Sequence, residues 1–156
     1  MVQEHIIIAE NEEHTRLAIS LILEDAGYKV TTAGNGREAL YLIQDCLKRK
    51  ERIDLLVTDL QMPILNGVEL IDKILERAIP IPIVIITGYK DTEIDIIASI
   101  NTRKFYDEFL NNDFNYLLEK PSNPEELIKS IESAINKFKQ KQQNLSIQND
   151  DKFRII

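Results

Sequence analysis

The segment Leu55-Leu56-Val57-Thr58-Asp59 decides the fold of this chain, because a short apolar run ends there on an acidic residue. An apolar run without polar alternation is typical of a strand that is buried on both faces of a parallel sheet. Four other short runs are predicted strands: Ile6–Ala9, Tyr28–Thr32, Ile83–Thr87 and Asn115–Leu118. Longer segments with helical periodicity separate the five runs, so the sequence predicts a regular alternation of strands and helices.

The predicted helices have recognisable ends. The first stops at Gly27, because a residue without Cβ suits the left-handed conformation that closes many helices. The last starts with Asn123 as N-cap, Pro124 in the first helical position and Glu126 as partner in a capping box. Apolar stripes place the others at about Arg37–Lys50, at Val68–Leu75 and after Asp91. Five such units predict a single α/β domain with an open, doubly wound parallel sheet.

Composition narrows the class of protein. The 156 residues suit one domain, and 44% apolar with 29% charged residues is an ordinary globular composition. A net charge of −7 argues against nucleic acid as a direct partner, because phosphate binding needs a basic surface. Cys46 is the lone cysteine, so no intrachain disulfide forms and a buried apolar role is expected for it. With no signal peptide or membrane-spanning run recognised, we expect a soluble, cytoplasmic protein.

Polar side chains follow four of the predicted strands. The cluster Glu10-Asn11-Glu12-Glu13 follows the first, Asp59 the third, Thr87 ends the fourth, and Lys120 follows the fifth. Doubly wound sheets place their sites at the carboxyl ends of the strands, so these residues should meet. A carboxylate that attacks phosphorus needs a divalent cation, a basic side chain and a hydroxyl nearby. The edge of the predicted sheet supplies an aspartate, an acidic cluster to bind the cation, a threonine and a lysine.

Short motifs along the chain resemble those of response-regulator receiver domains. They are Val57–Leu70 with its Met62-Pro63 pair and Gly67, Asn35–Leu40, Thr87-Gly88-Tyr89, Glu119-Lys120-Pro121 and Asn123–Leu127. The resemblance covers about residues 4–139, and each motif falls in the order of the family. It implies a flavodoxin-like fold with strand order 2-1-3-4-5. Residues 140–156 are interpreted as a polar C-terminal segment that either frays as a tail or serves as a linker, without a domain of its own.

The resemblance also implies a function and its residues. Asp59 would accept a phosphoryl group from a histidine kinase or phosphotransfer protein, and the chain would then switch the binding of a downstream protein partner. Such a chain is a binding module and not an enzyme. The implied site comprises Asp59, Thr87 as the hydroxyl that turns toward the phosphoryl group, and Lys120 as its cation. The implied Mg²⁺ ligands are Glu10, Asn11, Asp59 and the backbone carbonyl of Gln61. The Lys120-Pro121 bond is implied to be cis.

The acidic pair of the family is altered in this sequence. The family usually has two adjacent aspartates after the first strand, where this chain has Glu10 and Asn11. Asn11 occupies the position at which the family has the carboxylate that binds the metal directly. We therefore expect Mg²⁺ to bind more weakly but still to bind. Glu12 and Glu13 are interpreted as helix-start acids favoured by the helix dipole, in preference to metal ligands.

The segment between Thr87 and Lys120 spans 33 positions, which is longer than in the family. The excess lies at residues 101–112, where helical spacing of apolar residues predicts a helical extension or an extra helix; these are Phe105, Tyr106, Phe109 and Leu110. Two interpretations stay open: a surface for a partner or a homodimer on the side from the fourth strand to the last helix, or packing on its own domain. Leu117 occupies the position of the family's switching aromatic, and Tyr116 should face the other side of the sheet.

Two other hypotheses compete with the phosphoacceptor. One is a degenerate receiver that binds partners without regulated phosphorylation, suggested by Glu10-Asn11. The other is a phosphatase of the haloacid dehalogenase type, which needs a second acid where this chain has Gln61. His5 and His14 are interpreted as surface or edge residues and not as phosphorelay donors.

Overall fold

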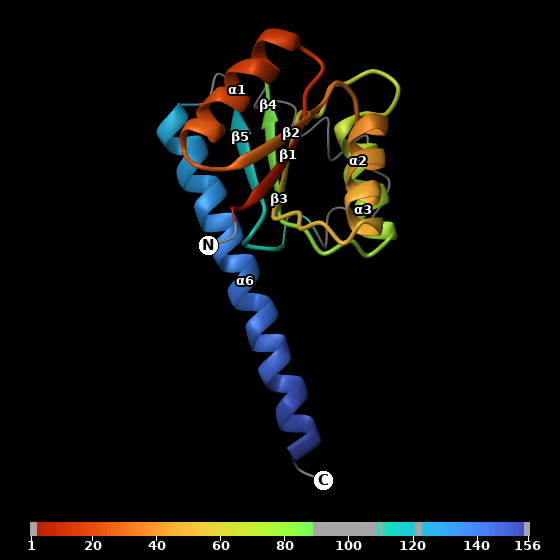
Figure 1. The fold of residues 1–156 in the computed structure, drawn as a ribbon, viewed down its shortest axis with the longest axis vertical. Helices are drawn as coiled ribbons and strands as arrows, with labels where there is room; N and C mark the ends of the chain where they lie inside the picture. The colour runs from red at the N-terminus through yellow and green to blue at the C-terminus, as the bar shows by residue number, and fades with distance from the viewer. Residues whose placement is uncertain (1–2, 89–108, 110, 121–122, 155–156) are drawn as a thin grey trace.

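The computed structural model describes residues 3–88, 109, 111–120 and 123–154, with side chains up to residue 147. Its strands form one parallel sheet in the order β2-β1-β3-β4-β5 (Figure 1). The strands are β1 (His5–Ala9), β2 (Lys29–Ala33), β3 (Leu55–Thr58), β4 (Ile83–Thr87) and β5 (Tyr116–Glu119). The helices are α1 (Glu13–Asp25), α2 (Gly36–Lys48), α3 (Gly67–Glu76) and α6 (Pro124–Arg154). The predicted doubly wound fold and its implied strand order are therefore confirmed.

Helices cover both faces of the sheet, and alternate strand residues belong to two separate cores. Ile7, Leu56 and Ile85 pack with α2 and α3, whereas Ile8 and Val57 pack with α1 and α6. Figure 1 shows α2 and α3 on one side of the strands and α1 and α6 on the other. Each fully buried aliphatic side chain stabilises the fold by roughly 1.5–3 kcal/mol, which is why the central strands carry no polar alternation.

Backbone geometry closes the first three helices in the same way. Gly27, Lys50 and Ala78 follow α1, α2 and α3 and have φ values of 98°, 56° and 52°. In each case the next residue donates a backbone hydrogen bond into the last turn: Tyr28 N to Leu23 O, Glu51 N to Cys46 O and Ile79 N to Ile74 O. This is the Schellman arrangement, so the helix end predicted at Gly27 is confirmed.

The inserted segment reaches the core at one described residue. Residues 101–108 and 110 lie outside the described part of the chain, as do the helix predicted after Asp91 and the Lys120-Pro121 bond. Phe109 is buried in the core on the α2 and α3 side. Asn115 fixes this region, because its Nδ2 donates to Phe109 O and its Oδ1 accepts from Ile83 N. At Phe109, packing on its own domain is the interpretation that holds.

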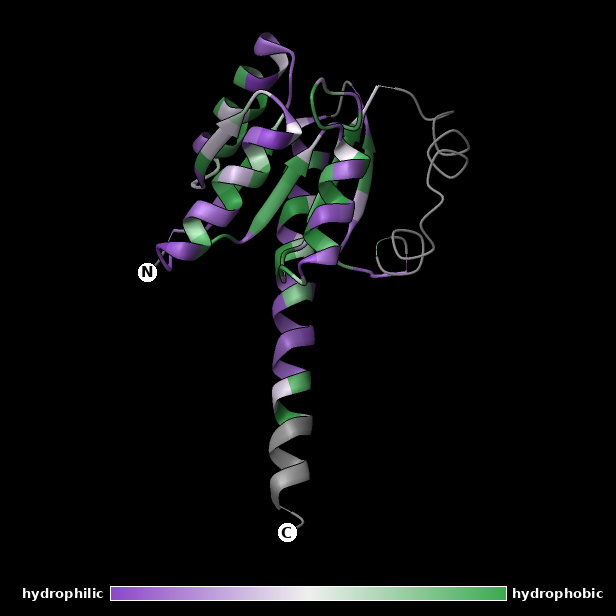
Figure 2. Cartoon of the chain, turned by 90° about the vertical axis from the view of Figure 1, so that its right-hand side faces the viewer, coloured by the Kyte–Doolittle hydropathy of each residue, from purple (hydrophilic) through white to green (hydrophobic). Residues whose placement is uncertain are grey.

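The last helix is longer than predicted. α6 runs from Pro124 to Arg154 without a break, so the alternative that the segment after residue 140 frays is wrong for residues 140–154, while a role as linker stays a prediction. The physical reason is composition: the segment after Pro124 has no Gly or Pro, and Lys and Gln favour helix. Residues 139–147 are exposed, apolar Leu145 and Ile147 among them, and Figures 1 and 2 show the helix projecting beyond the sheet. None of the described helices is long and apolar enough to span a membrane.

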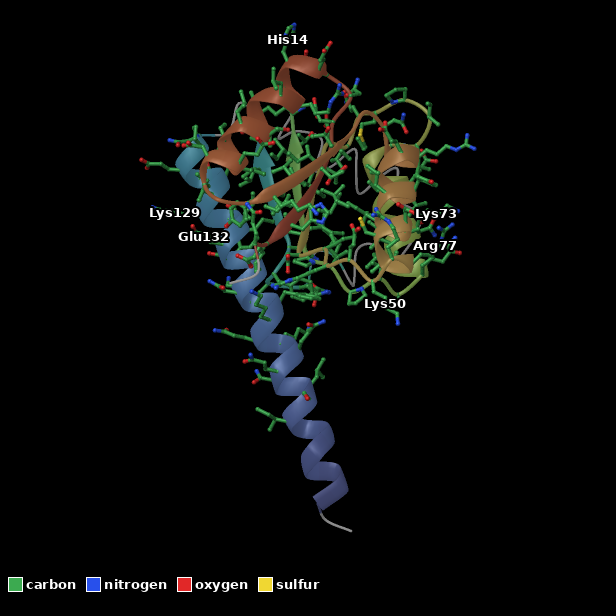
Figure 3. All side chains as sticks on the ribbon, viewed as in Figure 1. His14, Lys50, Lys73, Arg77, Lys129 and Glu132 are labelled. Carbon is green, nitrogen blue, oxygen red and sulfur yellow. The ribbon has the colours of Figure 1, made fainter. Side chains whose placement is uncertain are left out.

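The two histidines have different environments. His14 is exposed in the first turn of α1 and points into solvent (Figure 3), as predicted. His5 is buried, and the prediction of a surface or edge position is wrong for it. Its Nδ1 lies 2.9 Å from Arg52 O and its Nε2 lies 2.7 Å from Thr31 Oγ1, so the ring joins three segments of chain. Cys46 is buried and free, in agreement with its predicted apolar role.

Candidate functional site

The carboxyl ends of the strands bring the predicted site residues to one edge of the sheet. Strand pairing sets Ala9 beside Thr58 and Thr87 beside Glu119. The ladder continues one residue further, because Asp59 N donates to Ala9 O at 3.0 Å and Lys120 N donates to Thr87 O at 2.7 Å. The residues that follow β1, β3 and β5 therefore begin from fixed backbone positions.

Lys120 lies between two carboxylates. Its Nζ donates to Asp59 Oδ2 at 2.8 Å and to both oxygens of Glu10, at 3.0 and 3.1 Å. Glu10 and Asp59 are 2% and 7% exposed, so two acids are buried with one ammonium group between them. Buried charges are retained only where they are paired, and here a single cation pairs with both acids.

The electrostatics of this cluster favour an added positive charge. Burial and a hydrogen bond with Asp59 raise the pKa of Glu10 to about 7, against the opposing effect of Lys120. Burial would lower the pKa of Lys120, but its hydrogen bonds to Asp59 and Glu10 outweigh burial and raise it. The ammonium therefore stays charged at neutral pH, while Glu10 is close to the midpoint of its titration.

Backbone amides hold the Asp59 carboxylate. Its Oδ1 accepts from Leu60 N at 2.7 Å and from Gln61 N at 3.3 Å, while Oδ2 faces Lys120. Gly67 closes the loop by donating from its N to Leu60 O at 2.9 Å. The acid is thus fixed on one oxygen by the chain that follows β3, and the loop returns to it at the start of α3.

The residues that the resemblance implies as Mg²⁺ ligands lie in two places. Asn11 and Gln61 line a shallow hollow beside Asp59, together with Leu60, Met62, Pro63 and Asn66. Glu10 is turned toward Lys120. Within the described residues no three His, Cys, Asp or Glu side chains gather at one metal-binding point. The available donors are two carboxylates, one amide and one backbone carbonyl, all oxygen atoms of the kind that Mg²⁺ prefers, so the chemistry of these residues fits Mg²⁺.

The remaining residues singled out in the sequence have different roles in the structure. Thr87 is buried at the end of β4. Glu12 caps α1, because its carboxylate accepts from His14 N at 3.0 Å and Thr15 N at 2.6 Å, which confirms the helix-start interpretation for it. Leu117 packs with the core on the α2 and α3 side and Tyr116 with the opposite core, as the strand alternation predicted.

One residue at this edge is absent from the sequence prediction. Arg16 Nη1 donates to the backbone carbonyl of Glu10 at 2.8 Å and fixes the turn that carries Glu10. The signal available in the sequence was an arginine one helical turn after the Glu12 cap, on the face that looks back toward the strand.

The comparisons with known proteins agree with this fold. The pattern of the response regulator receiver domain matches residues 6–132. A probable transcriptional regulator, ycf29 of Porphyra purpurea, is 32% identical over 97% of this chain and 66% of its own length. An uncharacterized 14.6 kDa protein of Leptolyngbya boryana is 33% identical over 85% of this chain and 90% of its own length. Response regulator SaeR of Staphylococcus aureus is 27% identical, and the chain spans about half, 52%, of it.

Solved structures give the same result. A receiver domain protein from Clostridium thermocellum has a TM-score of 0.69 at 26% identity and covers 88% of this chain and 98% of its own. TrrA of Thermotoga maritima, in complex with Mg²⁺-BeF, has a TM-score of 0.65 at 23% identity, with coverage of 85% and 99%. This chain belongs to the family of response regulator receiver domains. It is therefore a receiver domain of two-component signalling.

Proposed function

We propose that this receiver domain accepts a phosphoryl group on Asp59 from a phosphohistidine of a histidine kinase or phosphotransfer protein. The observation that carries the proposal is the contact of 2.8 Å between Lys120 Nζ and Asp59 Oδ2, at the end of a buried strand. An ammonium group in this position can neutralise an anionic oxygen of the arriving phosphoryl group.

The transfer is a simple displacement. A carboxylate oxygen of Asp59 forms a bond to phosphorus, the bond between phosphorus and the imidazole nitrogen breaks, and the electron pair of that bond stays on the imidazole. Lys120 then donates to the new phosphoryl oxygens and loses part of its hydrogen bonding to the Glu10 carboxylate. Thr87, at the end of β4, is the hydroxyl proposed to turn toward the phosphoryl group. The amides of Leu60 and Gln61 keep the acid oriented throughout.

Mg²⁺ is the proposed cofactor, held by Asp59, Asn11, the carbonyl of Gln61 and, directly or through water, Glu10. When bound, it would supply positive charge against the repulsion between the carboxylate and the phosphoryl oxygens. The oxygen donors of this chain support the proposal, and TrrA, a relative in fold, holds Mg²⁺-BeF. Because Asn11 is neutral and Glu10 faces Lys120, we expect weak binding of the cation.

The proposed role of the domain in signalling follows from phosphorylation of Asp59. Phosphorylation is proposed to switch the binding of a downstream protein, in the cytoplasm, without catalytic turnover. The net charge of −7 supports a protein partner in preference to direct nucleic-acid binding by this chain. A homodimer through the side from β4 to α6 also belongs to this proposal. No hydrolysis of a generic phosphate ester is expected.

Labelling with acetyl phosphate in Mg²⁺ tests the proposal directly. The wild type should gain one phosphoryl group by intact-protein mass spectrometry, Asp59→Asn should gain none, and Asn11→Asp should bind Mg²⁺ more tightly. Beryllofluoride with Mg²⁺ should change the tyrosine fluorescence of the wild type but not of Asp59→Asn. If the wild type neither labels nor responds, the chain is a degenerate receiver. If Asn11→Asp leaves Mg²⁺ affinity unchanged, Asn11 lies outside the metal shell.

A further inference from the structure

A hollow of about 450 Å³ lies at the amino ends of the strands, on the opposite edge of the sheet from Asp59. Its walls come from the end of α2, the segments that precede β3 and β4, and the part of α6 that leaves the sheet. Most of the lining is apolar: Leu47, Ile53, Ile79, Ile81, Ile135 and Phe138. The two basic side chains at this hollow are paired within the chain, Arg52 with Asp54 and Lys139 with Glu4. The hollow therefore suits an apolar side chain better than a charged ligand.

The apolar face of α6 continues past this hollow onto the projecting part of the helix. Ile131, Ile135 and Phe138 are spaced by four and three residues, which places them on one stripe, and the first two are buried in the core. The same spacing leads to Gln142, which lines the hollow, and then to Leu145, which is 53% exposed. Leu145 therefore lies on the core-facing side of α6, beyond the end of the core.

The projecting segment has few of the charges that stabilise an isolated helix. No Asp or Glu occurs between Glu132 and Asp150, so an ion pair of residues four apart cannot form there, and residues 142–149 are all uncharged. A short helix of this kind gains most of its stability from packing on a neighbour. Because no ion has to lose its hydration, burial of this segment is not costly. The composition therefore favours a protein surface as the partner of the segment.

The lysines closest to the hollow are held by their own domain. Lys139 Nζ donates to Glu4 Oε2 at 3.0 Å, and Lys141 Nζ donates to Asn112 Oδ1 at 2.7 Å. A second helix that crosses α6 at Gln142 would therefore meet uncharged residues, and the two copies of each lysine need not face one another.

Two copies of this chain offer the surface that each of them lacks. If two α6 helices cross in opposite directions at Gln142, the rise of 1.5 Å per residue places each Leu145 about 4.5 Å past the crossing. At that level the other helix presents Phe138 and Lys139, which line the hollow. The contact is the same in both directions, so a two-fold axis closes it as a dimer. Helices that run in the same direction would pair Leu145 with Leu145 as a single apolar layer past the hollow, which is too little for a coiled-coil seam.

We propose that this chain forms a two-fold dimer in which the α6 helices cross in opposite directions and Leu145 of each copy enters the apolar hollow of the other. The contact uses the amino ends of the strands and the projecting part of α6 (Figures 1 and 2). It therefore differs from a homodimer through the side from β4 to α6. It also does not depend on the state of Asp59, which lies at the other edge of the sheet.

Sedimentation of the full chain over a concentration series measures this dimer. Leu145→Ser should raise its dissociation constant about tenfold or more, as expected for an anchor in a desolvated pocket. Ile147→Ser is the matched control and should leave the constant unchanged, because Ile147 is 59% exposed but lies about 200° further around the helix. Leu47→Ser should weaken the dimer from the side of the hollow. Tyr41→Ser, an exposed position of α2 outside the lining of the hollow, should not.

Paired cysteines test the direction in which the helices cross. In a Cys46→Ala background, the double variant Lys139→Cys/Leu145→Cys should form disulfide-linked dimers under mild oxidation, because positions 139 and 145 of opposite copies lie level. Leu145→Cys alone should not, since the two copies of position 145 lie about 9 Å apart along the helices and a disulfide needs Cα atoms within about 7 Å.

Several outcomes overturn the inference, and all of them leave the proposed function intact. A wild type that stays monomeric contradicts it. So does a dimer that Leu145→Ser leaves unchanged, or one that Ile147→Ser weakens equally, because the face of α6 would then not matter. A loss with Leu145→Ser but not with Leu47→Ser means that the side chain binds outside the hollow. Cross-linking of Leu145→Cys by itself means that the helices run in the same direction.

Discussion

Gly67 lies against the backbone of Asp59, so closely that a Cβ on Gly67 would be 2.1 Å from the Asp59 carbonyl oxygen. The atom that a Cβ would meet belongs to the backbone of Asp59, and this backbone cannot shift without disturbing the site. Gly67→Ala should therefore lower the free energy of unfolding by about 2–4 kcal/mol, as for other overpacked buried positions. Urea denaturation measures the loss.

Gly34→Ala is the matched control for that substitution. A Cβ there would meet only the Arg16 and Glu38 side chains, at 3.5 and 3.7 Å, which are ordinary contacts. It should cost far less than Gly67→Ala. Equal losses for the two variants would show that the close approach of Gly67 to Asp59 does not limit stability.

The stability of the domain should fall as pH rises from about 4.5 to about 7. The pKa of Glu10 is about 7 in the fold and 4.5 ordinarily, so the folded state binds its proton more tightly across this window. Deprotonation therefore favours the unfolded chain until pH passes 7, after which this contribution is constant. The loss should be on the order of 2–3 kcal/mol, measured by denaturation at several pH values.

Glu10→Gln should flatten this pH dependence, because the titrating group is gone while one acceptor for Lys120 remains. Glu13→Gln, an exposed acid in the first turn of α1, should keep the wild-type slope. If both variants retain the slope, the titration belongs to another group and the assignment to Glu10 is wrong.

Glu12→Ala should weaken α1 without affecting the metal. Hydrogen bonds from the Thr15 side chain and from the amides of Thr15 and His14 lower the pKa of Glu12 to about 2. The ionised cap therefore stabilises the fold above pH 4.5 and loses its effect as pH falls toward 2. Thermal melts should show a loss of a few degrees at pH 7 and little at pH 2, with the same Mg²⁺ affinity. A marked drop in that affinity would make Glu12 a ligand.

Ile64→Gly should stabilise the domain although it removes a side chain. Glycine adopts φ of 71° without steric cost, so relief of strain should exceed the added chain entropy by about 1 kcal/mol. Ala78→Gly, at the exposed helix end with φ of 52°, is a second position where a gain is expected. Chemical denaturation of both variants tests this, and a loss at Ile64 alone would mean that its turn is not strained.

Much of the architecture follows from apolar runs. β1, β3 and β4 are buried on both faces, so their sequences are mostly aliphatic. Such runs are typical of a parallel sheet that is covered by helices on both sides. The edge where Asp59 and Lys120 meet follows from the same reasoning, because parallel strands end together. The caps at Asn123 and Gly27 are local, and local chemistry is readable from neighbouring residues.

Other features depend on contacts that sequence spacing does not encode. The pairing of Glu10 with Lys120 joins positions 110 residues apart, and the reach of a glutamate in place of an aspartate decides it. The left-handed turn at Ile64 contradicts the preference of its own side chain, so no propensity argument finds it. The length of α6 was missed because the absence of helix breakers is a weaker signal than an apolar stripe.

The uninterrupted α6 extends far beyond the sheet, so a small rotation at its packed end gives a larger movement at its exposed end. Lys141 still contacts the domain, because its Nζ donates to Asn112 Oδ1. At 1.5 Å per residue, positions 142–154 extend about 20 Å beyond it. A tilt of about 10° at the packed end would move the tip by about 3 Å by the same geometry. A small change in how the packed end of α6 lies on the sheet would therefore become a larger displacement at its exposed end.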